Sequence, residues 1–97
     1  MAKKSTDNKE ADLRPQTFSL LAPDALSVQL VGDFTDWEKF PIEMYKSTSG
    51  VWQVTVKLET GPHYYRFLVN GEWRDDPGCD VRAPNDFGSQ NMVRTVG

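Results

Sequence analysis

Trp37 and Trp73 lie next to charged residues and outside the alternating apolar runs of this chain. An indole plane is an apolar surface on which the C–H groups of a sugar ring can stack, while the sugar hydroxyls need donors and acceptors around it. The alternative is that both rings cap the ends of a core, since tryptophan is highly buried on average. The two interpretations predict different exposure of the rings.

Arg66 could supply a donor at the edge of such a surface. If Tyr65, Phe67 and Val69 face the core of a strand over residues 63–70, then Tyr64, Arg66 and Leu68 face outward. A guanidinium is a permanent donor with a fixed fork of N–H groups. The alternative is a solvated arginine on an open sheet face.

A third segment, residues 85–91, offers Phe87, Ser89 and Asn91. The amide of Asn91 can both donate and accept, as paired sugar hydroxyls require, or it can form a local turn bond at the start of the last strand. Phe87 could lie against a ligand or fold back on the core.

Catalysis and metal binding are not expected. Four carboxylates near the long loop could serve glycoside hydrolysis, but that chemistry needs a cleft and acidic loop residues are usually turn formers; they are Asp75, Asp76, Asp80 and Asp86. Their spacing matches no EF-hand, His63 is the single histidine, and Cys79 has no evident base. We therefore expect no enzyme, no metal and no cofactor.

The elements that position these residues are short strands separated by turn residues. Period-two alternation is clearest at 50–58, where Trp52, Val54, Val56 and Leu58 share a face. Asn70-Gly71 is a strong hairpin signal. We expect strands at 16–21, 27–33, 42–46, 50–58, 63–70, 72–75 and 91–96, with a long ordered loop at 76–87. No helical periodicity of useful length is present, so an all-β sandwich is predicted.

The bulk properties of the 97 residues fit one domain at 15–97 behind a disordered polar tail at 1–14. A net charge of −3 without a basic stripe argues against nucleic acid. Cys79 is the only cysteine, which excludes an internal disulfide. No apolar run is typical of a signal peptide or a membrane span, so we predict a cytoplasmic protein that does not bind membranes.

The motifs occur in an order that resembles carbohydrate-binding module family 48. The pattern is Val-x-Leu-x-Gly-x-Phe-x-x-Trp, then Gly-x-x-x-Tyr-x-Phe-x-Val-x-Gly-x-Trp, then Asp-Pro, then Gly-x-x-Asn. Here it comprises Val28, Leu30, Gly32, Phe34 and Trp37; Gly61, Tyr65, Phe67, Val69, Gly71 and Trp73; Asp76 and Pro77; and Gly88 and Asn91. The similarity covers residues 16–96. It looks closest to the glycogen-binding domain of the AMP-activated protein kinase β subunit and to the N-terminal domains of isoamylases and glycogen branching enzymes.

This resemblance implies an immunoglobulin-like β-sandwich of the early-set type that binds α-1,4-glucans such as glycogen or starch without catalysis. The family's two stacking tryptophans fall on Trp37 and Trp73, and its basic residue, often Lys, falls on Arg66. The loop residue that inserts into the glucan, Leu in the kinase form, falls on Phe87, and the polar residues after it fall on Ser89 and Asn91. The alternatives are a protein-interaction module associated with a kinase or glucan-active enzyme, and a piece of a larger glucan-processing enzyme.

Overall fold

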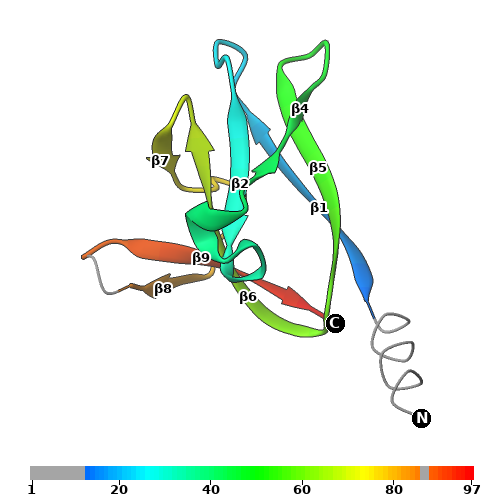
Figure 1. Ribbon diagram of the computed structural model, residues 1–97, viewed down its shortest axis with the longest axis vertical. Coiled ribbons are helices and arrows are strands. Elements are labelled where there is room, and N and C mark those ends of the chain that lie inside the picture. The colour runs from blue at the N-terminus through cyan, green and yellow to red at the C-terminus, as the bar shows by residue number, and fades with distance from the viewer. Residues whose placement is uncertain (1–12, 86–87) are drawn as a thin grey trace.

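The computed structural model describes residues 13–85 and 88–97, and its regular elements are strands and two short 3-10 helices. The 3-10 helices are η1 (Asp33–Thr35) and η2 (Trp37–Lys39). The strands are β1 (Arg14–Leu21), β2 (Val28–Gly32), β3 (Ile42–Glu43), β4 (Tyr45–Lys46), β5 (Val51–Leu58), β6 (Gly61–Val69), β7 (Glu72–Arg74), β8 (Arg82–Pro84) and β9 (Gln90–Val96) (Figure 1). No helix in the described part of the chain is long and apolar enough to cross a bilayer.

The strands form two antiparallel sheets. One has the order β1-β5-β4, and the other has the order β3-β2-β6-β9-β8, with β7 also paired to β6. β1 and β5 pair over the full length of both strands, from Arg14 opposite Leu58 to Leu21 opposite Val51. The all-β sandwich expected from the alternating pattern is thus confirmed.

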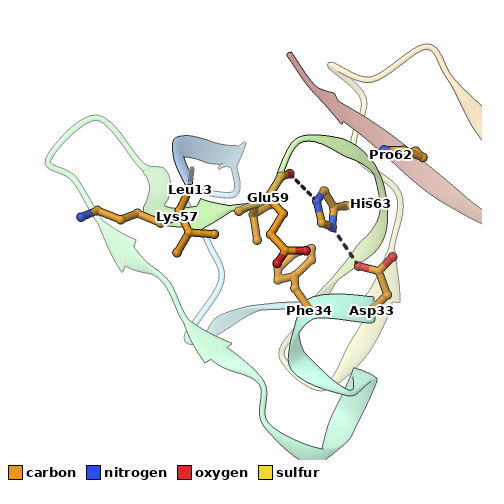
Figure 2. A pocket seen from close by; sticks show the side chains of 8 residues that line it. Leu13, Asp33, Phe34, Lys57, Glu59, Pro62 and His63 are labelled. Atoms are coloured by element: carbon orange, nitrogen blue, oxygen red, sulfur yellow. Dashed lines mark hydrogen bonds and ion pairs between the residues drawn. The ribbon is translucent and has the colours of Figure 1, made fainter. Parts of the chain in front are cut away.

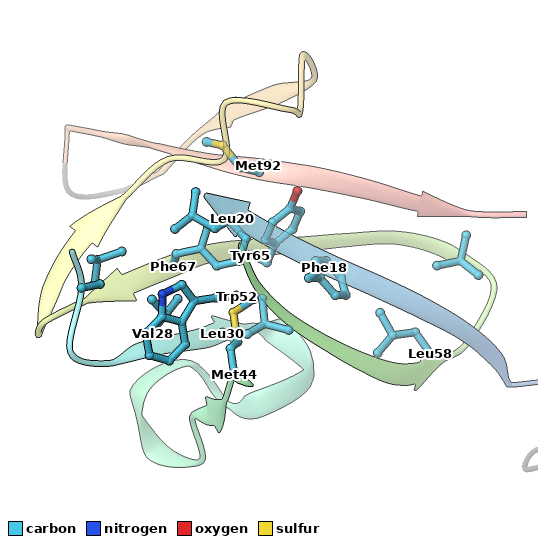
Figure 3. Close-up of a cluster of buried hydrophobic side chains, with 13 residues drawn as sticks. Phe18, Leu20, Val28, Leu30, Met44, Trp52, Leu58, Tyr65, Phe67 and Met92 are labelled. Carbon is cyan, nitrogen blue, oxygen red and sulfur yellow. The ribbon is translucent and has the colours of Figure 1, made fainter. Parts of the chain in front are cut away.

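The core lies between the two sheets and is formed by the inward-facing residue of every second position. In β6, Tyr65, Phe67 and Val69 are buried, and the rings of Phe18 and Tyr65 form a T-shaped contact with centroids 4.8 Å apart. In β5, Trp52 and Leu58 are buried while the residues between them alternate in exposure. Figure 3 shows these side chains filling the space between the sheets. The prediction of which residues of β5 and β6 point into the core is therefore correct.

The segment 42–46 is not one strand as predicted. β3 pairs with β2 in the larger sheet, whereas β4 pairs with β5 in the smaller sheet. Met44, between them, is buried in the core, and its N–H donates to the carbonyl of Val28 at 2.9 Å. The chain changes sheets at Met44, which alternation alone does not reveal.

Other boundaries also differ from the sequence-based expectation. The segment 76–87 is not entirely loop, because β8 pairs Arg82 with Met92 and Pro84 with Gln90. Pro84 stands in an edge strand, where a missing N–H is tolerated. β1 begins at Arg14, within the segment expected to be tail, and residues 1–12 lie outside the described part of the chain.

Candidate functional site

One face of the larger sheet carries three of the expected site residues. Tyr65 and Met92 are opposite each other and buried, so Arg66 on β6 and Asn91 on β9 point to the other, outer face. Trp73 on β7 is opposite Leu68, which shares the outer face with Arg66. Strand register thus brings Arg66, Trp73 and Asn91 to a single surface from three neighbouring strands.

The hairpin between β6 and β7 positions Trp73. Asn70 and Gly71 both have positive φ, 51° and 82°, as a two-residue hairpin turn requires. The Asn70 side chain also accepts hydrogen bonds from the N–H groups of Leu26 and Ser27, at 2.8 and 3.1 Å. The turn is therefore attached to the loop before β2, and Trp73 follows it with 40% of its surface exposed.

Arg66 lies against Trp73 instead of extending into solvent. Its guanidinium carbon is 5.2 Å from the centroid of the indole, within the range of a cation–π contact. Its Nη2 donates to Oδ1 of Asp75 at 3.1 Å, and its side chain is only 14% exposed. Arg66 points outward, as expected. Its side chain is not solvated, however, because it lies against Trp73.

Trp37 comes from the turn that follows β2. Asp36 and Trp37 both have left-handed backbone conformations, with φ of 53° and 54°, which side-chain-bearing residues rarely adopt. Thr35 stabilises this turn: its buried Oγ1 accepts from the N–H of Gly32 at 2.9 Å and lies 2.7 Å from the Trp37 carbonyl oxygen. Trp37 itself is half-buried.

The two tryptophans come from opposite sides of β6. β2 pairs with β6 on one side, and β7 pairs with it on the other, next to β9. Two strand spacings separate β2 from β7, about 10 Å. η2, which carries Trp37, packs against β2. Neither indole belongs to the buried core, in contrast to Trp52.

Asn85 organises the third segment and was missed by sequence reasoning. Its Nδ2 donates to Oδ1 of Asn91 at 3.1 Å, and its Oδ1 accepts from the N–H of Ser89 at 3.2 Å. The signal was present, since Asn after Pro commonly closes turns through its side chain. Ser89 is exposed and Asn91 half-buried, while Phe87 lies outside the described residues.

A separate depression of about 410 Å³ lies near the start of β6 (Figure 2). His63 borders it, with Nδ1 3.4 Å from Oδ1 of Asp33 and Nε2 2.8 Å from the carbonyl oxygen of Glu59. The five residue-to-residue steps from His63 to Leu68, which is paired with Trp73, span about 17 Å along the strand. This depression is therefore distinct from the face that carries Trp73.

Two of the acidic residues near the long loop have structural partners. No three His, Cys, Asp or Glu side chains in the described part of the chain are close enough to hold a metal ion. Asp75 pairs with Arg66 and Arg82, and Asp76 is buried, where it accepts from the hydroxyl of Tyr65 at 2.6 Å. These two carboxylates are occupied by structural partners.

Comparison with known proteins identifies the relatives of this chain. Residues 18–97 match the family described as the glycogen recognition site of AMP-activated protein kinase. The chain is 32% identical over 90 residues to the 5'-AMP-activated protein kinase subunit beta-1 of Sus scrofa, which covers 93% of this chain and 70% of that protein.

Two further relatives are much longer proteins. A 1,4-alpha-glucan branching enzyme of Lactobacillus acidophilus is 45% identical over 53 residues, 55% of this chain and 8% of the enzyme. A phosphoglucan phosphatase of Arabidopsis thaliana is 32% identical over 81 residues, 84% of this chain and 14% of the phosphatase. The match to the kinase family covers most of the described sandwich, including Trp37, Arg66, Trp73 and Asn91. The chain therefore belongs to the family of the glycogen recognition site of AMP-activated protein kinase.

Proposed function

We propose that the outer face of the larger sheet binds α-1,4-glucans such as glycogen or starch, and that it does so without catalysis. The observation that carries the proposal is the exposed indole of Trp73 on the same face as Arg66 and Asn91. The indole is a stacking surface for a sugar ring, and the amide of Asn91 is a donor and acceptor for hydroxyls. Family membership supports this class of ligand.

Trp37, Ser89 and Phe87 complete the proposed site. Trp37 follows β2, which lies on the other side of β6 from β7, and we assign it as the second stacking surface for a glucan that crosses β6. Ser89 belongs to the turn that Asn85 closes beside Asn91. Phe87, which precedes Ser89 by two positions, is assigned from the family resemblance, in which the inserting loop residue falls on it.

Binding is expected to be weak to moderate, because an open surface buries little of its ligand. A dissociation constant in the micromolar to millimolar range corresponds to about −8 to −4 kcal/mol. Electrophoresis through a native gel that contains glycogen should retard the chain relative to a gel without it. Trp73→Ala should remove most of this retardation, since aromatic anchors dominate such surfaces.

Tyr45→Ala is the matched control for this experiment. Tyr45 is also an exposed aromatic residue, but it lies on β4 in the smaller sheet. Its removal should leave retardation unchanged. Equal mobility of the unmodified chain in both gels would disprove glucan binding, and equal effects of the two substitutions would disprove the location of the site.

A second proposal is that the module works beside a kinase or glucan-processing enzyme. It is supported by the relatives, of which one is named a kinase subunit and two are named enzymes far longer than this chain. A cytoplasmic location accords with the free thiol of Cys79. Co-purification with such an enzyme, together with no change of tryptophan fluorescence on adding β-cyclodextrin, would favour this role over glucan binding.

A further inference from the structure

Asp75 is placed between two arginines at the edge of the Trp73 surface. Its Oδ1 is 3.1 Å from Nη2 of Arg66, and its Oδ2 is 3.3 Å from Nη1 of Arg82. Arg82 is itself fixed, because its Nη2 donates to the carbonyl of Cys79 at 3.1 Å. Each carboxylate oxygen of Asp75 therefore contacts a different guanidinium. One of the two, that of Arg82, is also hydrogen-bonded to the backbone of the segment that precedes β8.

The strand pairing of β6 changes at the position of Arg66. β6 pairs with β9 from Gly61 to Tyr65, and with β7 from Phe67 to Val69. Arg66 is thus the position at which the neighbour of β6 changes from β9 to β7. Asp75 directly follows β7, so the carboxylate reaches the side chain at the point where the two neighbouring strands separate.

The contacts of Arg66 indicate a supporting role beneath the indole. Its Nη2 is engaged by Asp75, its Nε is buried without a hydrogen-bond partner among the described residues, and its Cζ lies 5.2 Å from the centroid of Trp73. A guanidinium held in this position restricts the rotamers of the ring it faces. A ring that is already ordered before binding loses less conformational entropy when the ligand arrives.

We propose that Asp75 is a positioning residue that holds Arg66 against Trp73 and so prepares the indole for its ligand; this rests on the glucan-binding function proposed above. Removing the carboxylate leaves Arg66 and Arg82 without the anion between them. Arg66 is then free to leave the indole, and Trp73 samples more rotamers. Asp75 acts through Arg66 and need not touch the glucan.

The expected effect of Asp75→Ala is a loss of β-cyclodextrin affinity of about threefold to tenfold, the range expected when an ordering contact of this kind is removed. Isothermal titration calorimetry measures the affinity. Asp80→Ala is the matched control, because Asp80 is an exposed aspartate of the same connection between β7 and β8. Its affinity should stay within twofold of the unmodified chain.

A double-variant cycle separates positioning from a direct contact with the sugar. In an Arg66→Met background, Asp75→Ala should cause no further loss of affinity, because the side chain through which Asp75 acts is already gone. If Asp75→Ala does not fold, as judged by thermal melting, Asp75→Asn replaces it in the same cycle. An equal loss in both backgrounds, or no loss in the unmodified background, overturns the inference.

A ligand-free measurement tests the same contact independently. The indole N–H resonances of the three tryptophans are assigned by Trp→Phe substitution in a ¹⁵N–¹H spectrum. Asp75→Ala should shift or broaden the Trp73 resonance and leave that of the buried Trp52 in place. An unchanged Trp73 resonance overturns the positioning role, whereas absence of cyclodextrin binding by the unmodified chain overturns the proposed function itself.

Discussion

The hydroxyl of Tyr65 donates a hydrogen bond of 2.6 Å to Oδ2 of Asp76, and both side chains are buried. The other carboxylate oxygen, Oδ1, accepts from the N–H of Gly78 at 2.9 Å. Burial first, and then the hydrogen bond to Asp76, raises the pKa of Tyr65 far above its usual value. The Asp-Pro motif thus attaches the connection after β7 to the core.

Tyr65→Phe should destabilise the fold, because it leaves the buried carboxylate of Asp76 without this donor. The expected loss is about 1.5–3 kcal/mol in the free energy of unfolding, measured by urea denaturation at pH 7. Tyr64→Phe is the control, since Tyr64 is exposed on the outer face and should change stability by less than about 0.5 kcal/mol. Equal effects of the two substitutions would contradict this role.

The same hydrogen bond predicts a loss of stability at alkaline pH. Because the pKa of Tyr65 is raised in the folded state, the unfolded chain loses this proton first, near pH 10, and stability falls as the pH rises further. The stability difference between the unmodified chain and Tyr65→Phe should therefore shrink by about 1 kcal/mol between pH 9 and 10.5. A constant difference over this interval would show that Tyr65 ionises equally in both states.

Asn70 combines a backbone and a side-chain role that can be separated. Asn70→Gly should lose the hydrogen bonds to Leu26 and Ser27 but keep the positive φ at little cost, whereas Asn70→Ala should lose both. We expect Asn70→Ala to be less stable than Asn70→Gly by about 1 kcal/mol in chemical denaturation. Asn70→Asp keeps the accepting oxygen and should be the most stable of the three. Equal stability of the Gly and Ala variants would mean that the turn does not require this conformation.

Gly32 is required for space and not for its backbone conformation. A Cβ there would lie 2.5 Å from the carbonyl oxygen of Tyr64 and 2.7 Å from the ring of Phe34. Gly32→Ala should therefore lower the melting temperature, with a cost of about 1–3 kcal/mol for overpacking. Gly78→Ala is the comparison, since its Cβ would make only an ordinary contact with Asp76 at 3.4 Å. Similar melting temperatures for both variants would refute the steric explanation.

Trp52 and Trp73 should respond in opposite ways to substitution. Trp52 is buried, and its Nε1 donates to the carbonyl of Ala22 at 2.9 Å. Trp52→Phe should cost about 1–3 kcal/mol of stability and leave glucan affinity unchanged at a temperature where the variant is folded. Trp73→Ala should lose glucan affinity and little stability, because its ring is exposed. Calorimetry measures the glucan affinity of both variants, and thermal melting measures their stability. Loss of affinity in Trp52→Phe, or retention of affinity in Trp73→Ala, would contradict the expectation.

Much of the fold was predictable because it depends on neighbours in the chain. Period-two alternation identified the facing of β5 and β6, and Asn70-Gly71 identified the hairpin that carries Trp73. The same alternation placed Arg66, between the buried Tyr65 and Phe67, on the outer side of the sheet. By contrast, the division of 42–46 between two sheets depends on which strands pair with each half, and alternation within the segment contains no such information.

The sequence by itself determined the sandwich class and the outward direction of Arg66, because residue type and strand period act locally. Only the tertiary structure decided that Arg66 lies against Trp73, that Asp75 lies between Arg66 and Arg82, and that Asp76 is a core anchor. Adjacent aspartates have the same chemistry in the sequence. They acquire different roles because one side chain meets two guanidinium groups at the sheet edge, while the other enters the core beside a buried phenol.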